Sequence, residues 1–550
     1  MRVLIRILLF SCLMTSLMAQ SAEEYTRKSI TFLDAIVLAS PSARDMTIRQ
    51  IDYTAQMVKE RVQLDRFDYN PIPSESGLIS SFIGRVSGAD ELDLDGIAEL
   101  MNETFVPTIV AIMDEHAEQR ASSLVSETER MSFVATKAKE LGITAENLEQ
   151  VFNSGYIYLP YINGYSEETE AKTEDDKTKY SVTCHLHGGI FWFKIDYVDG
   201  KTEVRPIQKK QTHSLGVATK KDAGQAEWAA FKSAVANYAR NLENATKEIE
   251  DFKLKTGIVD MEGTTIGFNM GRREGLRIDD RYIVGEYTLT SSGETVFRKD
   301  GFARVKTIGD NRRNQGAMSY GYGVIVGNWA PGMSLIEYPR LALDIYGSLG
   351  TIPMATDMDD CSAESHIAVG AEMAYNIAAI MQQSHWYLTA GALIGDAAID
   401  YSGTTMAFEA TGLTFKAEVG LMKRVQLRRL DVFGRAGMGY HNTSFKLEES
   451  DGDTIQFSND AFGLSLGAGL NVTVNIDWTI GIRYNFYTGS SDAWSLMDSD
   501  DNDLGDWSEY YLDTPLNLQY SGSAILFQIS YAPPSLGFDP AAALGTMVGP

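Results

Sequence analysis

The stretch Phe462–Asn475, FGLSLGAGLNVTVN, and the stretch Asp477–Tyr487, DWTIGIRYNFY, decide the fold of the last third of this chain. In both, apolar residues stand at every second position, and Gly, Ser, Asn, Thr or Arg fill many of the positions between them. A period of two is typical of a β-strand whose two faces meet different surroundings. The same alternation recurs in eight segments between Arg340 and Pro533, so the sequence predicts strands throughout this region.

Charged residues lie on the face opposite to the apolar one. They are Asp344, Glu372, Lys416, Glu418, Arg435 and Arg483. A water-soluble β-sandwich buries its apolar face, whereas a transmembrane barrel turns that face to lipid and keeps polar groups inside. In a barrel, these three acidic and three basic side chains would form an interior charge network that fills a narrow lumen. Alternation alone leaves both architectures open.

The lengths of the connections favour the barrel. The long polar ones follow the first, third, fifth and seventh segments, at Gly350–Ser365, Gly395–Gly412, His441–Asp460 and Thr488–Gly522. The short ones follow the second, fourth and sixth, at Asn376–His385, Lys423–Leu430 and Asn475–Asp477. An outer-membrane barrel places long loops outside the cell and short turns in the periplasm. Residues 339–533 are therefore predicted to form an eight-stranded antiparallel transmembrane β-barrel.

These Gly-interleaved strands, together with Ala524–Tyr531, AILFQISY, resemble the small eight-stranded OmpA/OmpX-like outer-membrane barrels. The resemblance covers Arg340–Pro533 and implies an outer-membrane location with lipid around the barrel. Such barrels commonly end on an aromatic residue that the insertion machinery reads. Here Tyr531 is followed by a C-terminal tail, residues 534–550, which departs from that pattern.

Composition and the first residues fit an exported protein. The 550 residues carry a formal net charge of -26, which argues against a nucleic-acid partner because phosphate contacts need clustered Lys and Arg. Residues 1–19 read as a signal peptide, with Arg2 and Arg6 before an apolar core and a small residue, Ala19, at the cleavage site. Cys12 stands in a loose lipoprotein box, but Phe10 and the short apolar run count against lipidation.

Residues 20–179 are predicted to be a mostly helical α+β region. The stretch Asp93–Gly142 has amphipathic, helical character. The acidic run Glu167–Lys179, EETEAKTEDDKTK, is interpreted as an exposed loop or linker that ends this region.

Residues 180–338 are predicted to form a periplasmic β-rich domain, a small β-barrel or sandwich, that includes a long helix over residues 226–253. Cys184, His185 and His187 suggest a metal site. On a strand, however, Cys184 and His185 face opposite ways, and the two histidines share a face without a visible third ligand. We therefore predict neither a metal nor a cofactor.

The segment Asn269–Val284, NMGRREGLRIDDRYIV, resembles a turn in the β-domains of periplasmic envelope-assembly proteins, including FlgT-like flagellar and CsgG-like curli-secretion relatives. Asp279 replaces the Gly that the pattern expects before Asp280. The resemblance implies an architecture rather than a reaction.

Three classes of function follow. The leading hypothesis is a non-enzymatic outer-membrane protein whose barrel anchors residues 20–335 in the periplasm, where they scaffold or help assemble an envelope or secretion complex with protein partners. The second is a transport or secretion channel component. The third is a surface hydrolase on the barrel rim, built from Glu364, Ser365, His366 and His441. The acidic stretch 488–518 is interpreted as a solvated extracellular loop, with cation binding as the alternative.

Overall fold

The structure is a computed structural model that describes residues 25, 27–33, 35–72, 77–121, 136, 155–174, 177–198, 201–402, 408–448, 454–497, 503–505 and 516–534. It divides into two compact units. The N-terminal unit contains Glu24–Leu254 with Arg272–Gly275, and the C-terminal unit contains Lys255–Gly271 and Leu276–Pro534. The predicted signal peptide and almost all of the predicted tail lie outside the described residues.

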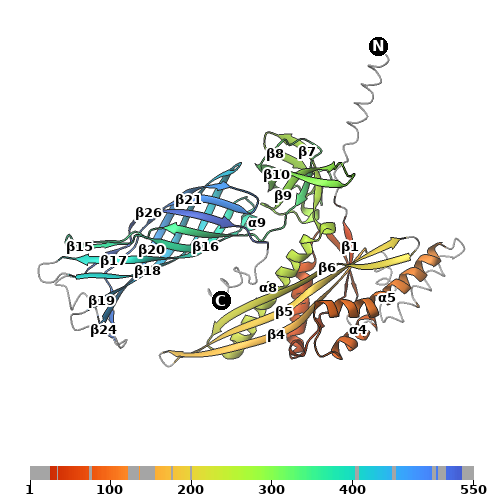
Figure 1. Cartoon of the computed structure of the whole chain (residues 1–550), viewed down its shortest axis with the longest axis horizontal. Helices are drawn as coiled ribbons and strands as arrows, with labels where there is room; N and C mark the ends of the chain where they lie inside the picture. Colours follow the sequence, from red (N-terminus) through yellow and green to blue (C-terminus); the bar gives the residue numbers. More distant parts are fainter. Residues whose placement is uncertain are drawn as a thin grey trace, which may run out of the picture. The chain divides into compact units, whose positions relative to one another are not determined.

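A mixed sheet in the order β3-β1-β4-β5-β6, with β2 beside β4, forms the centre of the N-terminal unit (Figure 1). Its strands are β1 Lys28–Leu33, β2 Val37–Leu38, β3 Phe67–Ile72, β4 Tyr156–Glu174, β5 Lys177–Val198 and β6 Lys201–Lys220. β1 pairs in parallel with β3 and β4, and the long strands β4, β5 and β6 pair antiparallel.

Helices pack on this sheet. They are α2 Pro41–Arg44, α3 Ile48–Val62, α4 Gly77–Ser87, α5 Leu94–Ala121 and α8 Ala223–Glu248, which is followed by the 3-10 turn η1 Glu250–Phe252. Alternation along β5 serves two cores, because Trp192 packs with α8 whereas Phe191 and Phe193 pack with α4 and α5. Among the described residues, no helix is both long and apolar enough to cross a bilayer.

The acidic linker predicted at Glu167–Lys179 is wrong. Most of this run lies in the paired ends of β4 and β5, with Glu170 opposite Ser181 and Lys172 opposite Lys179. Pairing satisfies the backbone hydrogen bonds, and exposed side chains on both faces leave the charges solvated. The boundary predicted between residues 179 and 180 consequently divides a hairpin. β5, β6 and α8 belong to the N-terminal unit.

Two further details of this region differ from the predictions. Helix α8 spans Ala223–Glu248 rather than 226–253, because Ile249 adopts an extended backbone and ends it. The short strands β1, β2 and β3 were not predicted, since runs of two to six residues show little periodicity.

The C-terminal unit begins with a closed six-stranded barrel in the order β10-β11-β8-β7-β12-β9. Its strands are β7 Lys255–Glu262, β8 Thr265–Phe268, β9 Arg281–Leu289, β10 Thr295–Thr307, β11 Ser319–Ile325 and β12 Ser334–Glu337. Asp279, just before β9, has a positive φ of 69°. A glycine is the usual residue for that conformation, and Asp is among the few others that tolerate it.

Eight strands of the described ranges close a second, larger barrel. They are β13 Leu343–Gly350, β16 Ala368–Asn376, β17 Trp386–Tyr401, β18 Phe408–Leu427, β19 Leu430–Glu448, β20 Thr454–Thr473, β21 Trp478–Tyr487 and β26 Gly522–Tyr531. Each strand pairs antiparallel with its neighbours, and the β13–β26 pairing completes the ring. The predicted fold class is confirmed.

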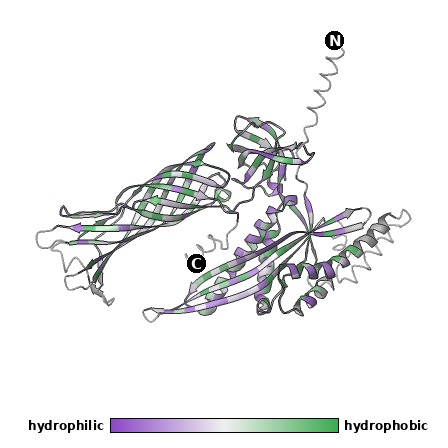
Figure 2. Ribbon diagram, viewed as in Figure 1, coloured by the Kyte–Doolittle hydropathy of each residue, from purple (hydrophilic) through white to green (hydrophobic). Residues whose placement is uncertain are grey.

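The outer face of the eight-stranded barrel is apolar and its inner face is polar, as a transmembrane barrel requires. Apolar residues alternate with polar ones along the strands (Figure 2). Their side chains stand outside the barrel, where Leu413 is 63% and Phe462 is 79% exposed. The charged Glu372 and Arg435 are buried inside. A soluble sandwich would bury the apolar face instead, so that alternative is excluded.

One end of the eight-stranded barrel, the turn end, carries the short connections, and the opposite end is the loop end. Helix α9 Ala378–Met381 lies in the first short connection. At the loop end, much of the expected loops Gly395–Gly412 and His441–Asp460 is strand, because β17 to β20 continue past the polar residues. Short strands fill the other long connections: β14 Ala355–Thr356, β15 Cys361–Glu364, β22 Ser490–Ser491, β23 Trp494–Met497, β24 Asp503–Gly505 and β25 Leu518–Gln519.

Candidate functional site in the lumen of the barrel

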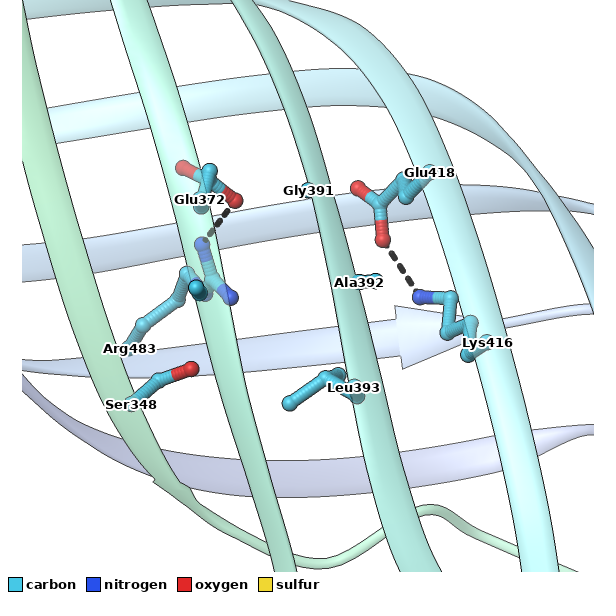
Figure 3. A pocket seen from close by; sticks show the side chains of 9 residues that line it. Ser348, Glu372, Gly391, Ala392, Leu393, Lys416, Glu418 and Arg483 are labelled. Carbon is cyan, nitrogen blue, oxygen red and sulfur yellow. Dashed lines mark hydrogen bonds and ion pairs between the residues drawn. The ribbon is translucent and has the colours of Figure 1, made fainter.

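A buried cluster of charges fills the middle of the lumen. Glu372 Oε2 accepts from Arg435 Nη1 at 2.5 Å and from Arg483 Nη1 at 2.8 Å. Arg435 also bonds Glu418, which in turn pairs with Lys416 and accepts from Ser465 Oγ. Figure 3 shows Glu372 facing Arg483 and Glu418 facing Lys416. Buried charges are stable only when they are paired and hydrogen-bonded, and this cluster meets that condition.

Glycines on the inward face make room for the cluster. A Cβ at Gly467 would lie 2.3 Å from Asn485 Oδ1 and 2.8 Å from Arg435 Cγ, and a Cβ at Gly391 would lie 2.8 Å from the Cβ of Glu372. The cavity that remains beside Glu372 and Lys416 has a volume of about 10 Å³, roughly what one water molecule needs. This cavity therefore has no room for a solute larger than a water molecule.

A second buried cluster lies at the turn end, and it joins the two barrels. Asp344 Oδ2 accepts from Arg424 Nη1 at 2.9 Å, within the eight-stranded barrel. Asp344 Oδ1 accepts from Arg281 Nη2 of the six-stranded barrel at 3.1 Å. The Arg424 guanidinium also lies 3.9 Å from the ring centre of Tyr387, a cation–π contact. One carboxylate thus receives an arginine from each barrel.

Asp279 and His385 form a further link at the same end. The Asp279 carboxylate Oδ2 accepts from the His385 backbone N–H at 2.7 Å and from Asn376 Nδ2 at 2.8 Å. The hydroxyl of Tyr322, on β11, bonds His385 Nε2. Burial raises the pKa of Tyr322 far above its usual value, so its hydroxyl stays protonated.

The segment between the two barrels is also fixed. Asp477, in the short connection before β21, accepts from Tyr338 Oη at 3.0 Å and from Arg340 Nε at 2.8 Å. The six-stranded barrel and the segment that follows it are therefore attached at three places on the turn end, through Asp344, Asp279 and Asp477. We call these contacts the barrel junction.

Apolar and aromatic side chains close the loop end from inside. Phe445 and Phe457, on inward positions of β19 and β20, stack at 5.3 Å with an interplanar angle of 24°. Trp494 and Tyr520, from the last long connection, pack into the same buried cluster. Tyr520 Oη donates to Thr443 Oγ1 at 2.9 Å. The lumen is thus filled at its loop end, in its middle and at its turn end.

Comparison with known proteins agrees with this geometry. Residues 330–508 match the model of the family described as outer membrane protein beta-barrel domain. The C-terminal barrel is an outer-membrane β-barrel domain. An outer-membrane barrel is in contact with lipid, and the exposed apolar band provides the surface for that contact.

Solved structures similar to this chain are also outer-membrane proteins. OprG from Pseudomonas aeruginosa is 12% identical over 35% of this chain and 97% of its own, with a TM-score of 0.26. Neisserial surface protein A is 9% identical over 35% and 99%, with a TM-score of 0.22. A major outer membrane protein from Thermus thermophilus is 14% identical over 35% and 99%, with a TM-score of 0.22. No curated protein matches the chain.

The six charged residues singled out by sequence all face the lumen of this outer-membrane barrel. Five of them form the middle cluster, and Asp344 belongs to the barrel junction. Arg424 was missed, although its even number places it on the same face of β18 as Lys416 and Glu418. Arg281 gave no comparable signal, because its partner lies in a different barrel.

The residues considered for a rim hydrolase do not form a triad. His366 lies 3.3 Å from Glu364 Oε1 and 3.5 Å from Asp396 Oδ2. Ser365 Oγ donates to Asp396 at 3.3 Å rather than to a histidine. His441 is buried in the lumen, where it stacks on Tyr520.

Cys184 does not join His185 and His187. It is buried in the core on the opposite face of β5. In the parts of the chain that the structure describes, no group of three His, Cys, Asp or Glu side chains is arranged to hold a metal ion.

Proposed function

We propose that this protein is a non-enzymatic outer-membrane anchor that holds its six-stranded barrel and its N-terminal unit in the periplasm, where they scaffold or help assemble an envelope complex. The barrel junction carries the proposal. Arg281, Asp279 and Tyr338 of the smaller barrel and its linker bond buried or part-buried partners at the turn end. Such contacts fix the position of the smaller barrel against the membrane anchor.

The orientation follows from the connections. Bacterial outer-membrane barrels place their short turns in the periplasm, and an even number of strands returns both ends of the barrel to the same side. The six-stranded barrel contacts the end with the short turns. It is therefore expected in the periplasm, and the chain that precedes it is expected there as well.

A channel is less well supported than an anchor. Eight strands leave an interior that side chains can fill. Here the charge cluster around Arg435 leaves a cavity of only about 10 Å³, and Phe445, Phe457 and Trp494 occupy the loop end. A rim hydrolase is also less well supported, because Ser365 donates to the Asp396 carboxylate and not to the histidine that a Ser–His–acid triad needs.

The class of partner is suggested by the segment Asn269–Val284, which resembles turns of flagellar and curli-secretion proteins of the periplasm. The family match begins at residue 330 and does not cover this segment, so the resemblance stays a prediction. Partners are accordingly expected among proteins that assemble structures in the envelope.

Cysteine labelling tests the orientation. In a background with Cys184 and Cys361 replaced by serine, Ser291→Cys places an exposed thiol on the β9–β10 turn of the six-stranded barrel, and Asp359→Cys places one at the loop end. A membrane-impermeant maleimide should label Asp359→Cys in intact cells. It should label Ser291→Cys only after the outer membrane is permeabilised.

Gel mobility provides the control for folding. Each variant should keep a mobility in cold detergent that changes on boiling, as expected if the eight-stranded barrel is intact. Labelling of Ser291→Cys in intact cells, with the mobility shift preserved, would place the six-stranded barrel outside the cell and refute the anchor as proposed.

A further inference from the structure

Three histidines gather on one face of the N-terminal sheet. His187 on β5 lies directly opposite His213 on β6, and His185 is two residues from His187 on the same face of β5. His185 Nδ1 and His213 Nε2 are 3.2 Å apart. The rings of His187 and His213 stack at 4.2 Å with an interplanar angle of 12°.

The distance between the two nitrogens suits a shared metal ion. Imidazole nitrogens bind Zn²⁺ at about 2.0–2.1 Å, and two such ligands at a tetrahedral angle are about 3.4 Å apart. We propose that His185 and His213 hold one divalent transition-metal ion of the class that prefers imidazole, such as Zn²⁺, Cu²⁺ or Ni²⁺. The site lies outside the outer-membrane barrel and is independent of the anchoring role.

The environment keeps these imidazoles ready to bind. Partial burial, together with the neighbouring histidines, lowers the pKa of His187 and of His213 below the usual histidine value. Neutral imidazole is the form that coordinates a metal. His187 and His213 are exposed to solvent and His185 is partly exposed, so an ion has access from outside.

The remaining coordination positions fall to His187 and water. Since no three side chains of the described residues already converge on one point, His187 must rotate out of its stack on His213 to become the third ligand. Cys184 cannot take this place, because it points into the core on the other side of the sheet. The predicted site is therefore all-histidine and open to water.

Titration of the full-length protein in detergent with ZnCl₂ tests the proposal. Isothermal calorimetry at pH 7.5 should show one strong site per chain. His213→Ala and His185→Ala should each weaken binding at least tenfold, and His187→Ala should weaken it less. Two matched controls, His366→Ala at an exposed histidine of the eight-stranded barrel and Cys184→Ser, should bind as the parent protein does.

A second measurement separates loss of ligands from loss of fold. With CuCl₂ in place of zinc, electron paramagnetic resonance of the parent protein should show hyperfine coupling to two or more nitrogens, and circular dichroism should show that each variant keeps its secondary structure. The proposal is overturned if the parent protein has no strong site, or if the His185→Ala/His213→Ala double variant binds zinc equally well. The two histidines would then form only a hydrogen-bonded pair.

Discussion

His385 makes the barrel junction sensitive to pH. It is buried, and this burial lowers its pKa from 6.5 to about 4. The Asp279 carboxylate opposes that change, whereas Arg304, Arg424 and Lys423 add to it. The junction therefore contains a neutral imidazole, whose Nε2 is hydrogen-bonded to the Tyr322 hydroxyl. The backbone N–H of His385 donates to Asp279.

Acidification is expected to weaken the junction. Between pH 6.5 and 4 the unfolded chain takes up a proton at His385 that the folded chain cannot, so stability falls as the pH falls. The full loss is about 3 kcal/mol, of which about 2 kcal/mol is lost between pH 7 and pH 5. Urea unfolding of the full chain at the two pH values measures it. In His385→Phe that part of the pH dependence should vanish. The same pH dependence in both proteins would show that His385 is not its source.

At the scale of single residues, the contacts of Asp279 could not be predicted from the sequence. The pattern expected glycine, and the positive φ of 69° at this position explains why glycine is favoured. The carboxylate that stands there instead bonds His385 and Asn376 of the other barrel. A departure from a local pattern was visible in the sequence. The role of this carboxylate depends on residues 97 and 106 positions away, which no local pattern contains.

At the scale of the strands, the buried charges join β16, β18, β19 and β21 across the lumen. Arg435 is the common member, since it bonds Glu372 on β16 and Glu418 on β18. Its side chain is only 1% exposed. Removing one member of such a group leaves its partners charged in a water-poor interior, which costs more than the group contributes as a whole.

Arg435→Met is expected to destabilise the eight-stranded barrel by about 3–5 kcal/mol, because Glu372 and Glu418 each lose a charged partner. The temperature at which the cold-detergent band is lost, together with urea unfolding, measures the change. Arg429→Met, at an exposed turn residue, is the matched control and should change stability by less than about 0.5 kcal/mol. Adding Glu418→Gln to Arg435→Met should increase the loss, because the buried Lys416 then loses its carboxylate partner as well. If the Arg435→Met protein is as stable as the control, the charge cluster does not stabilise the barrel.

Strand periodicity predicted the membrane strands and the residues that face the lumen, but it missed the strand extensions at the loop end and the acidic hairpin. The alternation gave the eight membrane strands and the inward face of all six charged residues, because lipid outside and a packed lumen inside impose opposite chemistry on neighbouring positions. It did not give the strand extensions at the loop end. There the polar sequences read as loops, while Phe445 and Phe457 continue to be buried inside. Nor could it give the acidic hairpin, where both faces meet water.

At the scale of the whole molecule, three barriers that follow one another close the lumen. An ion would have to pass the aromatic cluster around Trp494, the charge cluster around Arg435, and the six-stranded barrel held by Arg281 at the turn end. Barriers in series add, so opening one of them leaves the path blocked by the others. This arrangement distinguishes an anchor from a gated pore, in which loss of a single gate is enough for conduction.

Planar-bilayer recording of the full chain should consequently show no conductance above that of the lipid. Arg435→Met, which loosens only the middle barrier, should be equally silent, although its barrel is less stable. Arg435→Met combined with Asp344→Asn and removal of the Trp494 and Tyr520 rings by alanine relaxes all three barriers, and brief channel events are expected from this variant alone. Steady channels from the unaltered chain would contradict the sealed lumen and favour a transport role. If channels appear with Arg435→Met alone, the charge cluster is the only barrier that blocks the lumen, and the other two do not stop ions.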